Sequence, residues 1–228
     1  MTPPSLIAFD LDDTLYKERD FLRSGHRVLA RILAEATGED AGELFALISG
    51  NHPRGIEAAL AVLAAKGHDM PFAVDALVEI YRNHTPDIQL SPGIEALLTR
   101  LKAAGHRLAL ITDGSSRHQR SKIAALGLDR FFDPDAIFIS GETGGDKHTP
   151  LPFRLAEERF GASVSRMYYV GDNLAKDFVH PNLRGWISVM LLDTAGVNVF
   201  PQNIADWPTG HRPRVVVADP DRLFCPQK

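Results

Sequence analysis

Two aspartates, Asp10 and Asp12, stand two positions apart directly after an apolar segment, and Thr14 follows them. Residues 5–9 are short and apolar, which favours a buried β-strand. Side chains two positions apart along a strand point the same way, so both carboxylates are expected together at its carboxyl end, where open α/β sheets bind ligands. Two close carboxylates could bind a hard metal ion or divide nucleophile and acid/base roles, a pattern that suggests phosphoryl chemistry.

Three further apolar segments, at residues 108–111, 136–139 and 167–170, also predict strands. A hydroxyl with free amides at a helix start follows the first and could hold a phosphate. A lysine follows the second, and two aspartates follow the third. In chain order these residues are Thr112 with Asp113, Lys147, and Asp172 with Asp177. Four strand ends therefore supply complementary groups.

Each of these residues also has a plainer interpretation. Taken singly, Thr112 is typical of a helix cap, Lys147 of a solvated loop and Asp172 of a turn beside a glycine. An Asp-rich turn after a strand is itself more often a solvated loop or a cap than a catalytic site. The joint placement of the four groups favours catalysis over four unrelated structural roles.

In this order the four groups resemble the motifs of the haloacid dehalogenase-like hydrolases, and the resemblance covers roughly residues 5 to 195. It implies that Asp10 is the nucleophile that becomes an aspartyl-phosphate. Asp12 would then be the general acid/base, which protonates the leaving oxygen and later activates water. Because haloacid dehalogenases proper lack a carboxylate at the place of Asp12, its presence favours phosphate ester hydrolysis over carbon–halogen cleavage.

The resemblance also implies the binding groups of the site. Thr112 and the amide of Asp113 would hold the phosphoryl oxygens, and Lys147 would neutralise charge between nucleophile and phosphate. An Mg2+ ion would complete the site. Its implied ligands are the Asp10 carboxylate, the Asp12 carbonyl and the Asp172 carboxylate, with Asp177 beside them as a support or an alternative ligand.

Composition restricts the other function classes. The chain has 228 residues, 44% of them apolar, which is enough for one α/β core with a modest insertion. Its net charge of −4 and the lack of a Lys/Arg run argue against a nucleic-acid partner. The single cysteine, Cys225, fits a reducing cytoplasm, and no apolar run reaches the length of a membrane span.

A helix-rich stretch separates the first motif from the second. Apolar spacing predicts helices over residues 21–37, 56–65 and 72–81, broken by glycine and proline. In the resembled family an insertion here forms a helical cap that reads the leaving group. Polar residues between two of the helices, Asn51, His52 and Arg54, are candidates for substrate specificity, although a solvated turn is the simpler interpretation.

The sequence therefore predicts a doubly wound, mostly parallel α/β sheet in residues 1–16 and 89–228, with an all-helical cap in residues 17–88. Further strands are expected at residues 187–192 and 214–218, joined by an irregular connection. The predicted function is an Mg2+-dependent phosphomonoesterase acting on a small soluble ester, such as a sugar phosphate or nucleotide. A phosphomutase and a noncatalytic partner-binding module are the alternatives, and the sequence leaves the leaving group and the oligomeric state open.

Overall fold

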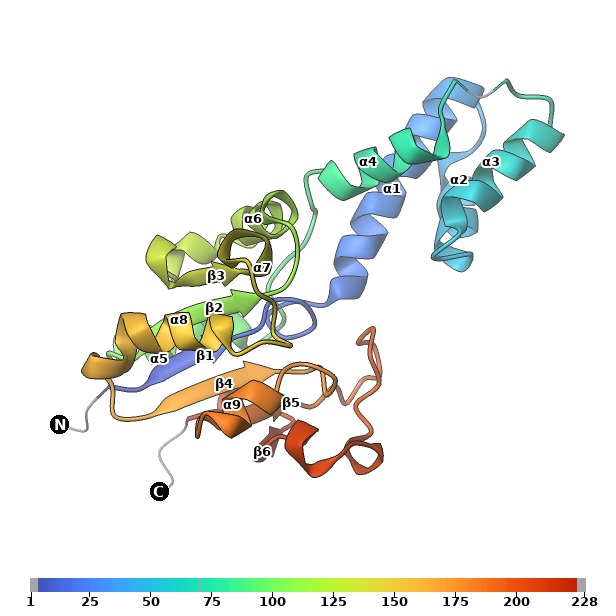
Figure 1. The fold of residues 1–228 in the computed structure, drawn as a ribbon. Coiled ribbons are helices and arrows are strands. Elements are labelled where there is room, and N and C mark those ends of the chain that lie inside the picture. Colours follow the sequence, from blue (N-terminus) through green and yellow to red (C-terminus); the bar gives the residue numbers. More distant parts are fainter. Residues whose placement is uncertain (1–3, 70, 225–228) are drawn as a thin grey trace. The chain divides into compact units, whose positions relative to one another are not determined.

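The computed structural model describes residues 4–69 and 71–224, and it divides into two compact units (Figure 1). The core unit comprises residues 1–19 and 89–228, and the helical unit comprises residues 20–88. Cys225, the single cysteine of the sequence, lies outside the described residues.

A six-stranded, fully parallel sheet forms the centre of the core unit, in the order β3-β2-β1-β4-β5-β6. Phe9, the last residue of the central strand, lies opposite Leu110 and Val170 of the two neighbouring strands. The sequence prediction of a doubly wound α/β fold with a helical insertion is confirmed. The strands are β1 (Leu6–Phe9), β2 (Arg107–Thr112), β3 (Ile137–Ile139), β4 (Met167–Gly171), β5 (Ile187–Leu191) and β6 (Val215–Val217).

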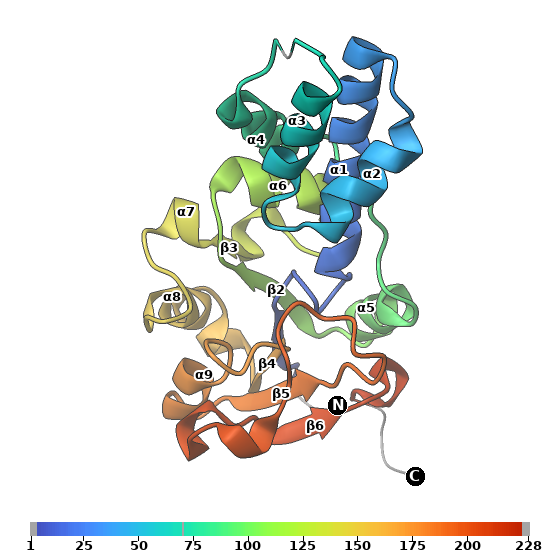
Figure 2. The same cartoon turned by 90° about the vertical axis from the view of Figure 1, so that its right-hand side faces the viewer.

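Helices cover both faces of this sheet, and Figure 2 shows α5 on one side and α8 and α9 on the other. Phe153 and Ala156 of α8 pack against Ala109 and Ile111 of β2 in one buried apolar cluster. Because both faces are covered, the strands read as continuous apolar runs. The helices of the core unit are α5 (Ile94–Ala103), α6 (Ser116–Ala125), α7 (Ser140–Thr143), α8 (Leu151–Phe160) and α9 (Val179–Leu183).

Short 3-10 helices of three residues each occur in the remaining chain, two of them in the connection predicted to be irregular. They are η1 (Leu128–Arg130), η2 (Pro134–Ala136), η3 (Gly161–Ser163), η4 (Ile204–Asp206), η5 (Thr209–His211) and η6 (Pro220–Arg222).

The helical unit contains the helices α1 (Glu18–Thr37, which begins in the core unit), α2 (Ala41–Gly50), α3 (Gly55–Ala65) and α4 (Val74–Asn83). Leu33, Ile48 and Leu63, from three of these helices, are almost fully buried in one apolar cluster. The apolar spacing did not single out α2, because its sequence is apolar on nearly all sides and lacks a clear polar face. Its start is fixed by Asp40, whose side chain accepts a hydrogen bond from the Glu43 amide at 2.8 Å.

Candidate active site

Asp10 and Asp12 follow the central strand, but their carboxylates have different partners. Strand β1 ends at Phe9, so Asp12 lies beyond the region in which alternate side chains point the same way. The Asp10 amide still continues the sheet by donating to the Val170 carbonyl at 2.8 Å. The two aspartates therefore contribute to two distinct parts of the site.

Lys147 joins Asp10 to Asp177 in the buried part of the site. Its Nζ lies 2.7 Å from Asp10 Oδ1 and 2.7 Å from Asp177 Oδ1, and its side chain is fully buried. Although burial disfavours the ammonium form, the two carboxylates hold the pKa of Lys147 well above its usual value. Lys147 is therefore a fixed positive charge beside the Asp10 carboxylate.

The Asp113 side chain fixes the loop that carries this lysine. Its Oδ1 accepts a hydrogen bond from the Lys147 amide at 3.0 Å, and its Oδ2 lies 3.2 Å from Lys176 Nζ. The family resemblance implied a function only for the backbone amide of Asp113. In the structure its carboxylate also has hydrogen-bond and ion-pair partners. Thr112, at the end of β2, is buried and its hydroxyl accepts a hydrogen bond from Gln119.

Hydrogen bonds occupy all the acceptor positions of the Asp177 carboxylate. Its Oδ1 accepts from Lys147 and from the Tyr169 hydroxyl at 3.2 Å, and its Oδ2 accepts from the amides of Asp172 and Asn173 at 3.0 and 2.8 Å. A carboxylate offers about four acceptor positions, and these four donors fill them. Asp177 therefore fits a supporting role better than that of a metal ligand.

Three buried carboxylates lie close enough together to surround a metal ion, although the hydrogen bonds of Asp177 leave only Asp10 and Asp172 of the three as ligands. Asp10, Asp172 and Asp177 each place one oxygen so that the three lie within 4.8 Å of one another. Burial raises the pKa of Asp10 to about 7, with a further rise from the Asp177 charge that Lys147 opposes. Burial and the charges of Asp177 and Asp10 raise the pKa of Asp172 to about 9. The raised pKa values show that these negative carboxylates repel one another. A divalent cation relieves repulsion between hard oxygen donors, so this set of carboxylates fits a divalent metal ion.

A separate group of polar residues surrounds the Asp12 carboxylate. Lys122 Nζ and the Tyr16 hydroxyl lie 2.6 and 2.5 Å from Asp12 Oδ1, and Gln119 Nε2 lies 3.0 Å from Oδ2. Burial alone would raise the pKa of Asp12, but the Lys122 charge and these hydrogen bonds lower it below its usual value. The same Gln119 nitrogen lies 2.6 Å from Thr112 Oγ1, so one side chain contacts both residues.

Gln119 and Lys122 were not found from the sequence. They stand three positions apart on α6, on the same face of the helix, and both are almost fully buried. Their spacing was the one available signal, but polar residues three apart on a helix more often face solvent.

The loop after β5 supplies another set of contacts that the sequence did not reveal. Asn198 donates to Asp172 Oδ2 at 3.0 Å, and Gln202 donates to the Asp172 carbonyl at 3.1 Å. Lys17 contacts Asn198 from the other side at 2.5 Å. This loop therefore orients the Asp172 carboxylate.

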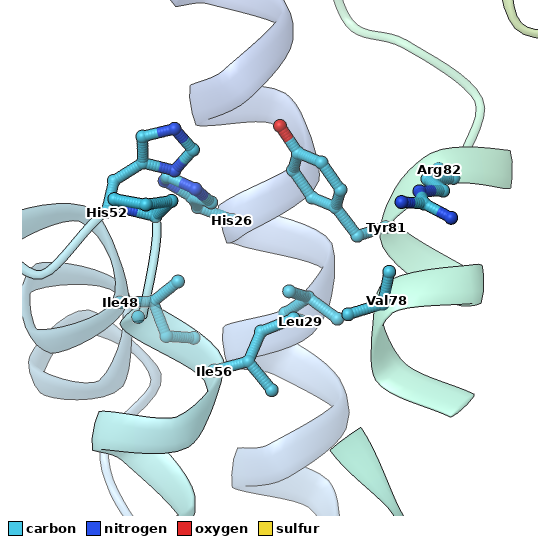
Figure 3. A pocket seen from close by; sticks show the side chains of 10 residues that line it. His26, Leu29, Ile48, His52, Ile56, Val78, Tyr81 and Arg82 are labelled. Carbon is cyan, nitrogen blue, oxygen red and sulfur yellow. The ribbon is translucent and has the colours of Figure 1, made fainter. Parts of the chain in front are cut away.

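The three candidate specificity residues lie together in the turn between α2 and α3, and all are exposed. Asn51 donates to the Leu47 carbonyl at 2.8 Å, which ends α2. His52 lines a pocket within the helical unit (Figure 3), whereas Asn51 and Arg54 do not.

The chain also matches a known family of proteins. The family model of the haloacid dehalogenase-like hydrolases matches residues 4–178, so the chain belongs to this family and is a hydrolase. The crystal structure of the putative HAD-hydrolase YfnB from Bacillus subtilis bound to magnesium has a similar fold, with a TM-score of 0.61, 22% identity and 98% coverage of both chains.

Curated relatives in this family are phosphatases. The chain is 28% identical to a glyceraldehyde 3-phosphate phosphatase of Methanopyrus kandleri over 89% of this chain and 90% of the relative. It is 30% identical to one of Pyrococcus abyssi over 75% of this chain and 74% of the relative. The predicted enzyme class, a hydrolase of the phosphatase type, is thereby confirmed. Across residues 4–69 and 71–224, no helix combines the length and apolar character needed to cross a bilayer.

Proposed function

We propose that the protein is a Mg2+-dependent phosphomonoesterase that hydrolyses a small phosphate ester through an aspartyl-phosphate on Asp10. The observation that carries this proposal is the separation of two carboxylates into unlike surroundings. Asp10 stands beside the fixed charge of Lys147, whereas Asp12 stands apart with its own hydrogen-bond donors. Two such carboxylates suit a nucleophile and an acid/base.

In the first half of the reaction, an oxygen of Asp10 attacks phosphorus and the bond from phosphorus to the ester oxygen breaks. Asp12 in its protonated form gives its proton to the departing oxygen, which leaves as an alcohol. Because Thr112 Oγ1 accepts from Gln119, the proton of its hydroxyl is available to a phosphoryl oxygen. Lys147 balances the negative charge that gathers around Asp10 and the phosphoryl group.

In the second half, Asp12 takes a proton from water, and the water oxygen attacks phosphorus. The bond from phosphorus to Asp10 then breaks, which releases phosphate and returns Asp10 to its carboxylate form and Asp12 to its protonated form. A bound Mg2+ would neutralise phosphoryl charge and would be held by Asp10, Asp172 and the Asp12 carbonyl. Asp177 would hold the Asp172 amide and Lys147 in place.

Several observations support a small ester as substrate. The curated relatives act on glyceraldehyde 3-phosphate, which is a sugar phosphate. The net charge of −4 offers little attraction to nucleic acid, which favours a small substrate over a macromolecular one. A single cysteine is a separate observation, and it suits a protein of the reducing cytoplasm.

Phosphate release from a panel of sugar phosphates, nucleotides and simple organic phosphates tests the proposal. The wild type should release phosphate with Mg2+ and lose that activity with a chelator. Asp10→Asn should abolish release, whereas Asp129→Asn, which changes an exposed aspartate of η1, should leave it unchanged. Full activity in Asp10→Asn would refute the assigned nucleophile, and an isomer in place of free phosphate would establish a mutase.

A further inference from the structure

The loop between β5 and η4, residues 192–203, holds Asp172 at two points. Asn198 Nδ2 donates to Asp172 Oδ2 at 3.0 Å, and Gln202 Nε2 donates to the Asp172 carbonyl oxygen at 3.1 Å. The Asp172 amide in turn donates to Asp177 Oδ2 at 3.0 Å. Neighbouring side chains therefore fix both the backbone and the carboxylate of this candidate metal ligand.

These contacts leave one carboxylate oxygen of Asp172 available. Asn198 occupies Oδ2, whereas within residues 4–69 and 71–224 no hydrogen-bond donor contacts Oδ1. The Asp172 side chain is also almost fully buried, which limits its contact with water. A carboxylate that is held by one oxygen presents the other oxygen in a set direction.

Gln202 also joins the carboxyl ends of two neighbouring strands. Asp172 follows β4 and Leu191 ends β5, and Gln202 Nε2 lies 3.1 and 2.9 Å from their carbonyl oxygens. In the parallel pairing of these strands the last opposed residues are Gly171 and Met190. Gln202 therefore satisfies two carbonyl groups beyond the last strand pair and fixes the backbone that carries Asp172.

The side-chain amides of Asn198 and Gln202 have defined orientations, because their own oxygens have donors. Lys17 Nζ lies 2.5 Å from Asn198 Oδ1, and the Asp193 amide donates to Gln202 Oε1 at 2.7 Å. A side chain turned over would place its NH2 group against these donors. The NH2 groups of both residues are therefore directed at Asp172.

The loop is anchored on its other side to the segment that follows the first motif. Asp193 Oδ2 accepts a hydrogen bond from the Asn198 amide at 2.6 Å, and its Oδ1 lies 3.5 Å from Lys17 Nζ. Asp13 Oδ2 accepts a hydrogen bond from the Val199 amide at 2.8 Å. These contacts keep the Asn198 side chain in a fixed position beside Asp172.

The donors to Asp172 are neutral, although like charges surround it. One oxygen each of Asp10, Asp172 and Asp177 lie within 4.8 Å of one another, and Lys147 Nζ pairs with Asp10 and Asp177. Asn198 holds the Asp172 carboxylate without adding a positive charge, which would repel a cation. The choice of an amide over a lysine or arginine therefore suits a carboxylate that binds a metal ion.

We infer that Asn198 and Gln202 are positioning residues, which set the direction of the Asp172 carboxylate and thereby favour Mg2+ over Ca2+ at this site. The inference rests on the Mg2+ site of the proposed function and deepens it. Mg2+ demands a near-ideal octahedral arrangement of oxygens at about 2.0–2.1 Å, whereas Ca2+ accepts about six to eight oxygens in flexible arrangements. An Asp172 carboxylate that is free to turn would therefore weaken Mg2+ binding more than Ca2+ binding.

Calorimetric titration of the full-length protein with Mg2+ and with Ca2+ tests this inference. Asn198→Ala and Gln202→Ala should each weaken Mg2+ binding by about 10- to 100-fold and Ca2+ binding by about threefold at most. Asp172→Asn, which removes the charge of the ligand, should weaken the binding of both ions by at least about tenfold. Asn203→Ala is the matched control, because it removes an exposed amide of the same loop that donates to Asp206, and it should change neither affinity.

Unchanged Mg2+ affinity in the two loop variants, or an equal loss for both ions, would overturn the inference. A wild type that binds no Mg2+ would also overturn it. A merely structural role would lower stability without a contrast between the two ions, so urea unfolding is measured with a chelator present. Gln202→Ala decides the outcome if this measurement shows that Asn198→Ala does not fold.

Phosphate release by the same proteins separates this failure from that of the proposed function. If the loop variants show the contrast between Mg2+ and Ca2+ but the wild type releases phosphate from no ester, the positioning role stands and the phosphatase proposal fails. If the wild type releases phosphate with Mg2+ but the loop variants lose both ions equally, the phosphatase proposal stands and the positioning role fails.

Discussion

Replacement of Asp177 by asparagine is predicted to destabilise the core unit severely, although the two side chains have nearly the same size. Asp177 is fully buried, and its two oxygens accept four hydrogen bonds. An asparagine must turn its NH2 group either toward Lys147 or toward the amides of Asp172 and Asn173. Either orientation places a donor against a donor and removes the negative charge.

The size of the effect follows from the contacts. Removing one partner of a buried ion pair costs about 3–5 kcal/mol. Lys147 keeps Asp10 as a second partner, which lowers the cost, whereas the lost acceptor for two backbone amides adds about 1–3 kcal/mol. We therefore expect Asp177→Asn to lower the free energy of unfolding by about 3–5 kcal/mol.

Urea unfolding followed by tryptophan fluorescence measures this loss. Both tryptophans of the chain, Trp186 and Trp207, lie in the core unit, so the signal reports on that unit. The measurement is made with a chelator present, which excludes an effect through metal binding, and with Asp129→Asn as the exposed control. A loss of unfolding free energy below about 1 kcal/mol, with an unchanged dependence of that free energy on urea concentration, would refute the reasoning. It would show that water or a local rearrangement satisfies the four hydrogen-bond donors.

Three further predictions concern the site and the helical unit. Gly171→Ala would place a Cβ 2.5 Å from Asp177 Oδ2, so urea unfolding should show a loss of about 1–3 kcal/mol, whereas Gly210→Ala, with open space around it, should show little change. Isothermal titration with Mg2+ should show binding to the wild type and at least about tenfold weaker binding to Asp172→Asn; equal affinity would exclude Asp172 as a ligand. Because the folded-state pKa of His26 is about 4, below its ordinary value of 6.5, the unfolded chain binds the extra proton first, and stability should fall as the pH drops from about 6.5 to about 4. Between pH 6.5 and pH 4 the thermal unfolding temperature should depend less steeply on pH in His26→Gln than in the wild type. Identical dependence in the two proteins would contradict the prediction.

Local patterns in the sequence predicted the sheet and the principal candidate site residues. Strands buried on both faces appear as continuous apolar runs, and their carboxyl ends meet at one edge of a parallel sheet. The positions of Asp10, Thr112, Lys147 and Asp172 after four such runs could therefore be read without a structure. The helical unit followed from apolar spacing, except for α2, whose polar face is too small to reveal a helical period.

Only the tertiary structure decided which partner each of these groups has. Asp12 leaves the strand and meets Gln119 and Lys122, more than a hundred residues away in the chain. Asp177 has all its acceptor positions filled, and Arg82 has no partner among the described residues. The sequence determines these residue types and their local elements. Which charge is paired, buried or left available depends on packing between distant segments, and a local pattern does not contain that information.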